Sequence, residues 1–171
     1  ITKQLRFFSR PGSKEFEAVN LQDVLKGSEE LLIPNLTAGR IQYGFYLPEQ
    51  PVIVRGNRLR LEQVVTNLLR NAVDAMLDEE ERLLQVTISK TETHGIMRIS
   101  DTGAGIGQST IRDLEEPFYT TRASGEGMGL GLAISTEIVK EHGGMIHAEN
   151  REPKGAIFII EIPLEEETEN A

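Results

Sequence analysis

Apolar residues spaced three and four apart predict four helical segments along the chain. The first carries Ile1, Leu5 and Phe8, and the pattern stops at Arg10-Pro11-Gly12-Ser13, where proline and glycine break a helix. We therefore interpret this segment as the end of a helix that belongs to a preceding domain.

A second helix is expected after Asn20, whose side chain suits the N-cap position, and Pro34 would lie just beyond its end. The longest helix is predicted at Asn57–Leu77. The last is predicted at Leu130–His142, where Gly143-Gly144 terminates it. The buried side of the second helix is expected to carry Val24, Leu25, Leu31 and Leu32.

Alternation of apolar and polar residues predicts strands between these helices. Val86 and Ile88 alternate with polar neighbours, and Ile96–Asp101 follows across a turn expected at His94-Gly95, so the two form an antiparallel hairpin. One of the two strands expected before residue 55 should be an edge strand, because proline has no backbone N–H to donate to a neighbouring strand. The other strands are predicted at Ile41–Leu47, Pro51–Val54, Met145–Glu149 and Ala156–Ile162.

This order of elements indicates a two-layer α/β (α+β) sandwich, with a mixed, mostly antiparallel sheet of about five strands packed on three helices. A chain of 171 residues is long enough for one well-filled core and short for two. We expect an upstream helix tail and linker at residues 1–13, one domain at residues 14–164 and a disordered acidic tail at residues 165–171. The first residue is not Met, so we interpret the chain as part of a longer protein.

Composition narrows the possible functions. The chain has no cysteine, which removes disulfides and thiolate sites, and it has no apolar run near the roughly 20 residues that span a bilayer. A cytoplasmic location is expected for this piece. The formal charge of −9 disfavours nucleic acid as a partner. A bound nucleotide would need local compensation from backbone N–H groups, a helix N-terminus and a divalent cation.

The first of two glycine-rich runs, Asp101–Gly107, follows a predicted strand. A carboxylate at that position can accept a hydrogen bond from the exocyclic amine of adenine, whereas guanine presents a carbonyl there. Gly103, Gly105 and Gly107 allow positive φ and leave no Cβ to block a base or sugar. The alternative for this run alone is an ordinary Asp-Thr-Gly turn.

The second run, Gly125–Leu132, leads into the last predicted helix. Gly127, Gly129 and Gly131 could expose N–H groups and the positive end of the helix dipole to a triphosphate. The alternative is a flexible loop before a helix. The chain has no Gly-Lys-Ser/Thr sequence and no GxGxxG spacing, which excludes a Walker loop and a dinucleotide fingerprint.

Two asparagines on the longest helix are candidate oxygen ligands. Asn67 and Asn71 are four residues apart, about 40° on one helix face, so both amides can reach one ligand such as Mg²⁺. The alternative is that they are buried structural residues. Glu62 is roughly half a turn out of phase with Asn71 and should face elsewhere, which argues against a catalytic base at that position.

Five ordered stretches resemble the successive boxes of the ATP-binding domain of sensor histidine kinases. They are NLLRNAVDA, DTGAGIG, EPFYTTR, GEGMGLGL and the closing Gly155-Ala156-Ile157-Phe158. The resemblance covers about residues 20–163 and extends to the wider superfamily of gyrase, Hsp90 and MutL ATPases. It implies a Bergerat fold that binds ATP and Mg²⁺.

The resemblance also implies roles for individual positions. Asn71 would hold Mg²⁺ and Asp101 would contact adenine, while Gln108–Gly127 would form a mobile ATP lid. Phe118 would anchor that lid unless it is a core residue, and Arg122 would reach the γ-phosphate unless it is a surface charge. The catalytic positions implied are Asn67, Asn71 and Arg122. The nucleotide contacts implied are Asn67, Asn71, Asp101, Gly103, Gly105, Ile106, Phe118, Thr120, Thr121, Gly127, Met128, Gly129, Leu130, Gly131 and Leu132.

One position separates branches of this superfamily. Hydrolytic members carry a glutamate four residues before the magnesium asparagine, and here that residue is Asn67, which cannot accept a proton at neutral pH. The resemblance therefore implies slow hydrolysis and transfer of the γ-phosphate to a histidine on a separate helical domain. A regulatory nucleotide-binding module without transfer and a protein serine kinase of the anti-sigma type are the alternatives.

The phosphorylated histidine is expected upstream, because no phosphoacceptor motif is present. We interpret His94, His142 and His147 as structural, in a turn, at a helix end and in a strand. The resemblance implies three partners: ATP, an upstream dimerisation domain and a response regulator. It also implies a monomeric fragment within a homodimeric protein that could be anchored in the inner membrane. The ending LRFFSRP and the sequence NAVDA resemble the nitrogen-sensing and C4-dicarboxylate-sensing branches.

Overall fold

The structure is a computed structural model that describes residues 15–114 and 127–166, with the backbone alone for residues 127–130. Its main sheet has five strands, in the order β2-β4-β5-β7-β6. β2 runs parallel to β4, and every other neighbouring pair is antiparallel. This confirms a mixed, mostly antiparallel sheet. The strands are β2 (Gln42–Tyr46), β4 (Leu83–Lys90), β5 (His94–Asp101), β6 (Met145–Asn150) and β7 (Ala156–Pro163).

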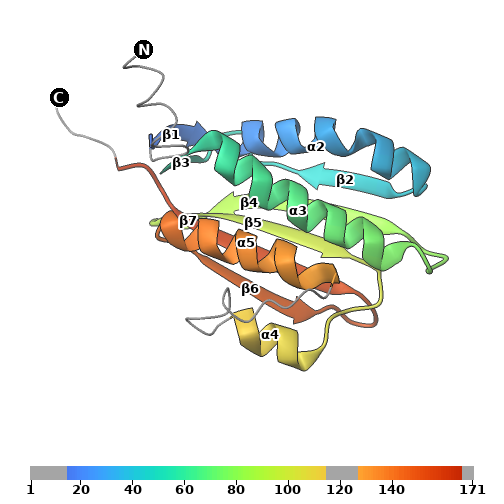
Figure 1. Ribbon diagram of the computed structural model, residues 1–171. Coiled ribbons are helices and arrows are strands. Elements are labelled where there is room, and N and C mark those ends of the chain that lie inside the picture. The colour runs from blue at the N-terminus through green and yellow to red at the C-terminus, as the bar shows by residue number, and fades with distance from the viewer. Residues whose placement is uncertain (1–14, 115–126, 167–171) are drawn as a thin grey trace, which may run out of the picture.

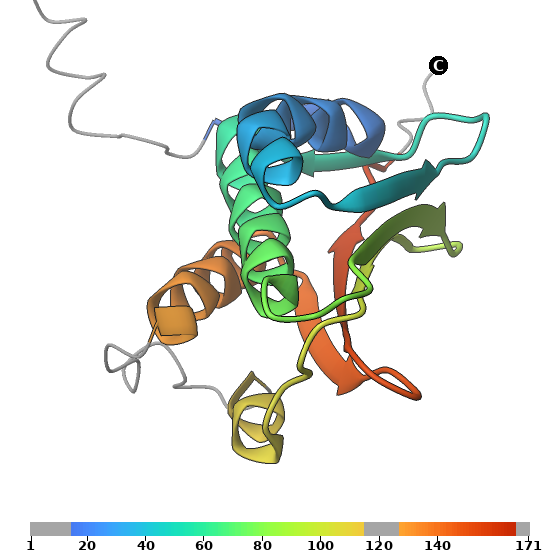
Figure 2. The same ribbon diagram turned by 90° about the vertical axis from the view of Figure 1, so that its right-hand side faces the viewer.

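Three helices cover one face of this sheet and form the second layer (Figures 1 and 2). They are α2 (Leu21–Ala38), α3 (Arg58–Met76) and α5 (Gly127–Glu141). The described ranges contain a fourth helix that the sequence did not predict, α4 (Gln108–Leu114), which lies near β6. A separate pair of strands, β1 (Glu17–Asn20) and β3 (Ile53–Gly56), is antiparallel. The sandwich of a sheet packed on three helices is confirmed, and α4 is an additional helix in the described ranges.

The core lies between the two layers, because β4, β5 and β7 present every second side chain to the helices. Leu68 and Leu69, on adjacent positions of α3, are 0% and 1% exposed, so this helix is central to the core. Within the described residues, no helix combines the length and the apolar character that crossing a membrane requires.

Asparagine side chains begin two of the helices, as the sequence indicates. The Oδ1 atom of Asn20 accepts a hydrogen bond from the backbone N–H of Gln22 at 2.7 Å. Asn57 does the same for Arg60 at 3.0 Å. Each cap satisfies an N–H that has no partner within its helix. The predicted N-cap at Asn20 is confirmed, as is the longest helix after Asn57.

The end and the buried face of α2 were predicted wrongly. The helix continues through Pro34 to Ala38, and Leu31 is 61% exposed. Leu32 and Leu36 are buried on either side of Pro34, and their packing offsets the hydrogen bond that proline cannot donate. Leu31 lies about 100° from Leu32 around the helix and so falls outside the buried face.

The β4–β5 turn and two other features also differ from the prediction. The turn comprises Thr91–Thr93, so His94 and Gly95 belong to β5 instead of the turn. Side chains of Val52 and Leu21 closely approach the position that a Cβ of Gly95 would occupy. β1 was not predicted. β3 pairs with β1 outside the main sheet, and Val54 of β3 also forms an isolated bridge with Leu164. Glu165, the first residue of the predicted tail, donates its N–H to the carbonyl of Ile53 at 2.9 Å.

Candidate functional site

Asp101 ends β5 and is almost fully buried, with 2% of its surface exposed. Its Oδ1 atom accepts a hydrogen bond from the backbone N–H of Gly103 at 2.8 Å. Burial raises the pKa of the Asp101 carboxyl, while the N–H groups of Gly103 and Ala156 and the charge of Arg151 act in the opposite direction. A buried carboxylate that is only partly compensated favours a further hydrogen-bond donor.

The glycines that follow Asp101 serve different purposes. Only Gly105 of the three has a positive φ, of 88°. A Cβ on Gly103 would lie 2.5 Å from the carbonyl oxygen of Ala75, so the last turn of α3 occupies the space of a side chain. A Cβ on Gly107 would meet nothing within 4 Å. Of the three glycines that permit positive φ, Gly105 is thus the one that adopts it.

Asn150 holds the glycine run in place, and the sequence analysis missed it. Its Oδ1 atom accepts from the N–H of Ile106 at 2.8 Å, and its Nδ2 atom donates to the carbonyl of Ile106 at 2.9 Å. Both backbone groups of Ile106 are thus bonded by one amide at the end of β6. An asparagine at the end of a strand is common in turns, so the sequence carries no specific signal for this contact.

Asn71 has an unusual environment on α3. Its Nδ2 atom is buried and has no hydrogen-bond partner in the described part of the protein. Buried amide groups normally have partners, so this side chain is suited to a ligand. Rotation of the amide places its oxygen in the same position, and amide oxygens are ligands that Mg²⁺ accepts. Asn71 therefore fits the metal role expected of it.

Asn67 lies one turn earlier on α3 and contacts α5. Its Nδ2 atom donates to the hydroxyl of Ser135 at 3.5 Å, which gives this side chain a structural contact. Glu62 lies elsewhere, as expected. It pairs with Arg58 at 3.1 Å, and its carboxylate fills the space beside Gly27 on α2.

Successive turns of α3 bring the predicted elements of the site together. Ala75 contacts the glycine run, because its carbonyl accepts the N–H of Ala104 at 3.2 Å. Asn71 and Asn67 follow at intervals of about 6 Å along the helix axis, and Asn67 reaches α5. Asp101 through its glycine run, the candidate metal ligand Asn71 and the middle of α5 are therefore arranged along one helix.

The remaining predicted positions follow α4 in the chain. Phe118, Thr120, Thr121 and Arg122 lie outside the described residues. Gly127, Met128, Gly129 and Leu130 form the first turn of α5, where only the backbone is described. A Cβ on Gly131 would meet nothing within 4 Å, whereas Leu132 is completely buried in the core.

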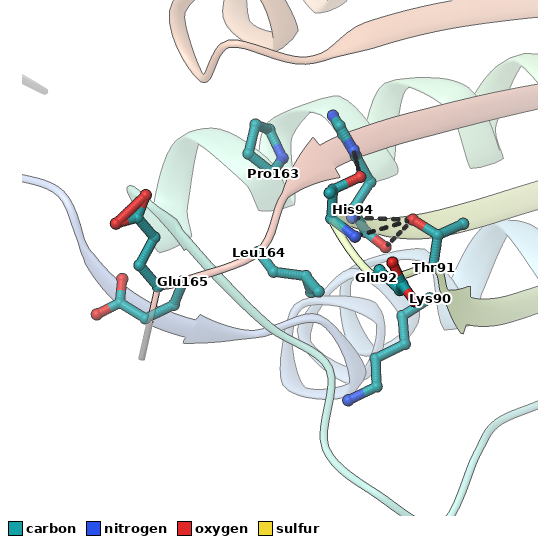
Figure 3. Close-up of a pocket in the computed structure, with 9 residues that line it drawn as sticks. Lys90, Thr91, Glu92, His94, Pro163, Leu164 and Glu165 are labelled. Atoms are coloured by element: carbon teal, nitrogen blue, oxygen red, sulfur yellow. Dashed lines mark hydrogen bonds between the residues drawn. The ribbon is translucent and has the colours of Figure 1, made fainter. Parts of the chain in front are cut away.

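A surface hollow lies at the opposite end of β5, around His94 and Pro163 (Figure 3). It is lined by the β4–β5 turn and the residues after β7. The length of β5 separates it from Asp101 by about 23 Å, so it is not part of this site. No cluster of three or more His, Cys, Asp or Glu residues suited to a metal occurs in the two described ranges. A cation here would depend on amide, phosphate and water oxygens.

Comparison with known proteins agrees with this geometry. A family model described as "Histidine kinase-, DNA gyrase B-, and HSP90-like ATPase" matches residues 56–166. The C4-dicarboxylate transport sensor protein DctB of Rhizobium meliloti is 36% identical over 163 residues, which cover 95% of this chain and 26% of DctB. The sensor protein FixL of Bradyrhizobium diazoefficiens is 33% identical over 168 residues, which cover 98% of this chain and 33% of FixL. The chain thus spans about a quarter to a third of these relatives.

Solved structures show the same likeness. The nucleotide-free catalytic domain of histidine kinase ThkA has a TM-score of 0.75 and 30% identity, over 88% of this chain and 98% of that domain. ThkA in complex with the response regulator protein TrrA has a TM-score of 0.72 and 29% identity, over 95% of this chain and 46% of ThkA.

Proposed function

This chain belongs to the histidine kinase-, DNA gyrase B- and HSP90-like ATPases as a histidine kinase catalytic domain, and on that premise we propose that it transfers the γ-phosphate of Mg-ATP to a histidine on a separate helical domain. The observation that carries the proposal is the arrangement of Asp101, Asn71 and α5 along the last turns of α3. The base would lie at Asp101, the metal at Asn71 and the phosphates at the N-terminus of α5.

Asp101 would recognise the adenine base. Its buried carboxylate accepts one hydrogen bond from Gly103 and can accept another from the 6-amino group of adenine. Guanine has a carbonyl oxygen at that position, which would face the carboxylate unfavourably. The preference for ATP over GTP follows from this single group.

Asn71 would hold Mg²⁺, since its amide nitrogen has no partner among the described residues and an amide oxygen is a hard ligand. When bound, Mg²⁺ would neutralise negative charge on the phosphates. The backbone N–H groups at the start of α5 would bind the phosphates, because a helix N-terminus carries partial positive charge. Arg122, outside the described residues, is proposed to approach the γ-phosphate.

Neither Asn67 nor Glu62, the two positions considered for a catalytic base, can activate water. The amide of Asn67 cannot accept a proton at neutral pH, and the carboxylate of Glu62 faces α2. The chain would therefore bind and orient ATP without promoting hydrolysis. The bond between the γ-phosphorus and the bridging oxygen would break as a bond to a histidine nitrogen of the acceptor domain forms, which releases ADP.

The partners of the whole protein are also proposals. We infer an upstream dimerisation domain that carries the acceptor histidine, and a response regulator that receives the phosphate. The ThkA–TrrA complex is the precedent for the second partner. The likeness to DctB supports a place in the C4-dicarboxylate-sensing branch.

The test is incubation of the chain with γ-labelled ATP and Mg²⁺, in the presence and absence of the parent protein's dimerisation hairpin. Acid-labile, base-stable label on the hairpin alone is expected. Binding of ATP without transfer would contradict the kinase proposal, and acid-stable label would indicate a serine kinase. Replacement of the acceptor histidine on the hairpin by glutamine is the control and should abolish the label.

A further inference from the structure

Arg82 joins the C-terminal ends of two helices. Its guanidinium donates to the carbonyl of Gly39 at 2.8 Å, of Leu77 at 2.6 Å and of Glu79 at 2.8 Å. Gly39 is the C-cap of α2 and Leu77 is the C-cap of α3. Carbonyls at a helix C-terminus lack partners in the helix and carry partial negative charge, which suits the planar fork of an arginine.

The same segment is fastened to the strand that ends at Asp101. The hydroxyl of Thr102 donates to the carbonyl of Glu81 at 2.8 Å and accepts the N–H of Leu83 at 3.0 Å. These two residues flank Arg82. Thr102 follows Asp101 directly and is 4% exposed, so its position and that of the carboxylate are coupled.

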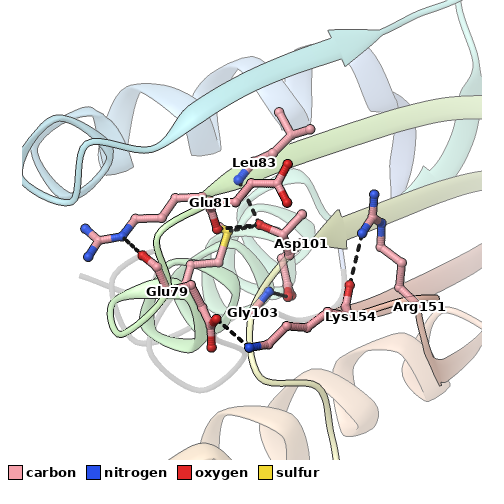
Figure 4. Close-up of polar contacts among 10 residues, drawn as sticks. Glu79, Glu81, Leu83, Asp101, Gly103, Arg151 and Lys154 are labelled. Atoms are coloured by element: carbon pink, nitrogen blue, oxygen red, sulfur yellow. Dashed lines mark hydrogen bonds and ion pairs between the residues drawn. The ribbon is translucent and has the colours of Figure 1, made fainter.

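A third set of contacts reaches the other side of Asp101 (Figure 4). Glu79 forms an ion pair with Lys154 at 2.5 Å. The carbonyl of Lys154 accepts from Arg151 at 3.0 Å, and the charge of Arg151 acts on Asp101. The segment from Leu77 to Arg82, which we name the α3–β4 loop, thus supports Asp101 from two sides.

We propose that Arg82 is a positioning residue that holds the α3–β4 loop, and through Thr102 holds Asp101, in the place required to select adenine. This inference rests on the proposed role of Asp101. Hydrogen bonds weaken steeply as their geometry departs from linear, so a small displacement of the carboxylate reduces recognition of the 6-amino group. The proposed phosphate contacts lie at the N-terminus of α5 instead of in this loop, so they should change less.

The test compares ATP with inosine triphosphate, which has a carbonyl in place of the 6-amino group. Direct binding of both nucleotides is measured by calorimetry on the full chain with Mg²⁺. The variants are Arg82→Lys, which keeps the charge but loses the fork, and Asp101→Asn. The matched control is Arg40→Lys, because Arg40 is exposed, lies beside Arg82 and makes no side-chain bond within the described ranges.

We expect Arg82→Lys to weaken ATP binding by about tenfold and inosine triphosphate binding by less than about threefold. The ratio of the affinity for ATP to that for inosine triphosphate, which measures selectivity, should thus move towards that of Asp101→Asn. Arg40→Lys should keep the selectivity of the original chain. If Arg82→Lys weakens the binding of ATP and of inosine triphosphate in equal proportion, as a general loss of folded protein would, the proposal is overturned.

Unchanged selectivity in Arg82→Lys would also overturn the proposal, whatever the change in thermal stability. If Asp101→Asn loses selectivity but Arg82→Lys does not, only the role of Arg82 fails. If Asp101→Asn keeps selectivity, adenine recognition by this carboxylate fails and the role of Arg82 fails with it. Amide exchange of the Gly103 N–H, without nucleotide, is an independent readout and should be faster in Arg82→Lys than in Arg40→Lys.

Discussion

The carbonyl oxygen of Ala75 lies 2.5 Å from the point where a Cβ of Gly103 would be. The final turn of α3 and the glycine run after Asp101 are therefore in direct backbone contact. The N–H of Ala104 donates to the same carbonyl at 3.2 Å. This contact links the helix that carries Asn71 to the end of the strand that carries Asp101.

Gly103→Ala should disturb both folding and nucleotide binding. The added methyl group meets backbone that cannot rotate away, so the free energy of unfolding should fall by about 1–3 kcal/mol. Urea unfolding monitored by circular dichroism measures this. Gly107→Ala is the matched control for stability, because its methyl group would meet nothing within 4 Å. Equal stability of the two variants would contradict the close contact.

Asp101→Asn should greatly weaken ATP binding, with loss of the preference over inosine triphosphate, and should not destabilise the protein. Burial raises the pKa of Asp101 above its ordinary 3.8, so the ionised form is less favourable in the folded protein than in the unfolded chain. The contribution of this group to stability is therefore complete below pH 3.8 and is lost as the pH rises through the raised pKa. At neutral pH the variant should be at least as stable as the original chain.

Titration of Asp101 should change nucleotide affinity in the opposite direction from its effect on stability. Protonation of Asp101 removes an acceptor, so ATP affinity should decrease as the pH falls through the raised pKa. Calorimetry at a series of pH values measures the decrease, and inosine triphosphate is the control. Undiminished ATP affinity in Asp101→Asn would remove this carboxylate from adenine recognition.

Asn71→Ala should separate stability from metal-dependent binding. The variant removes a buried amide nitrogen that has no partner in the described structure, so the free energy of unfolding should stay constant or rise by up to about 1 kcal/mol. ATP affinity with Mg²⁺ should fall by about tenfold, and affinity with a chelator should not change. A large loss of stability with unchanged Mg²⁺ dependence would assign Asn71 a purely structural role.

His142 should make stability depend on pH. Its Nδ1 group donates to the carbonyl of Ile138 at 2.8 Å, and its Nε2 atom accepts the N–H of Asn57 at 3.1 Å. This arrangement requires a neutral ring. Burial lowers the pKa of His142 below its ordinary 6.5, and the charge of Arg60 acts in the same direction, while the Ile138 carbonyl and Glu141 oppose it. The interpretation of this histidine as structural agrees with these contacts.

The stabilising effect of the neutral ring is complete above pH 6.5 and is lost as the pH falls towards the lowered pKa, because the unfolded chain binds the proton more readily. Urea unfolding at pH 7.5 and at successively lower pH measures the loss. His142→Gln should flatten the dependence. His147→Gln, which changes a more exposed histidine paired with Glu161 at 3.2 Å, should retain it.

The spacing of residues close together in the chain was sufficient to predict much of the fold. The N-cap at Asn20, the long helix after Asn57 and the β4–β5 hairpin depend on neighbouring residues, and their pattern is visible in the sequence. The candidate site was found for a similar reason. A carboxylate followed by glycines, and two asparagines one helical turn apart, are local patterns whose chemistry follows from residue type.

Contacts between distant segments decided the rest. The continuation of α2 through Pro34 depends on packing of Leu32 and Leu36. Arg82 follows three glutamates and has the appearance of a surface charge, yet it binds carbonyls up to 43 positions away. Asn150 reaches Ile106 across 44 positions. The sequence by itself thus determined most of the elements and the chemical groups of the candidate site. The tertiary structure alone decided which backbone groups hold them, because hydrogen bonds and packing between remote segments leave no periodic pattern along the chain.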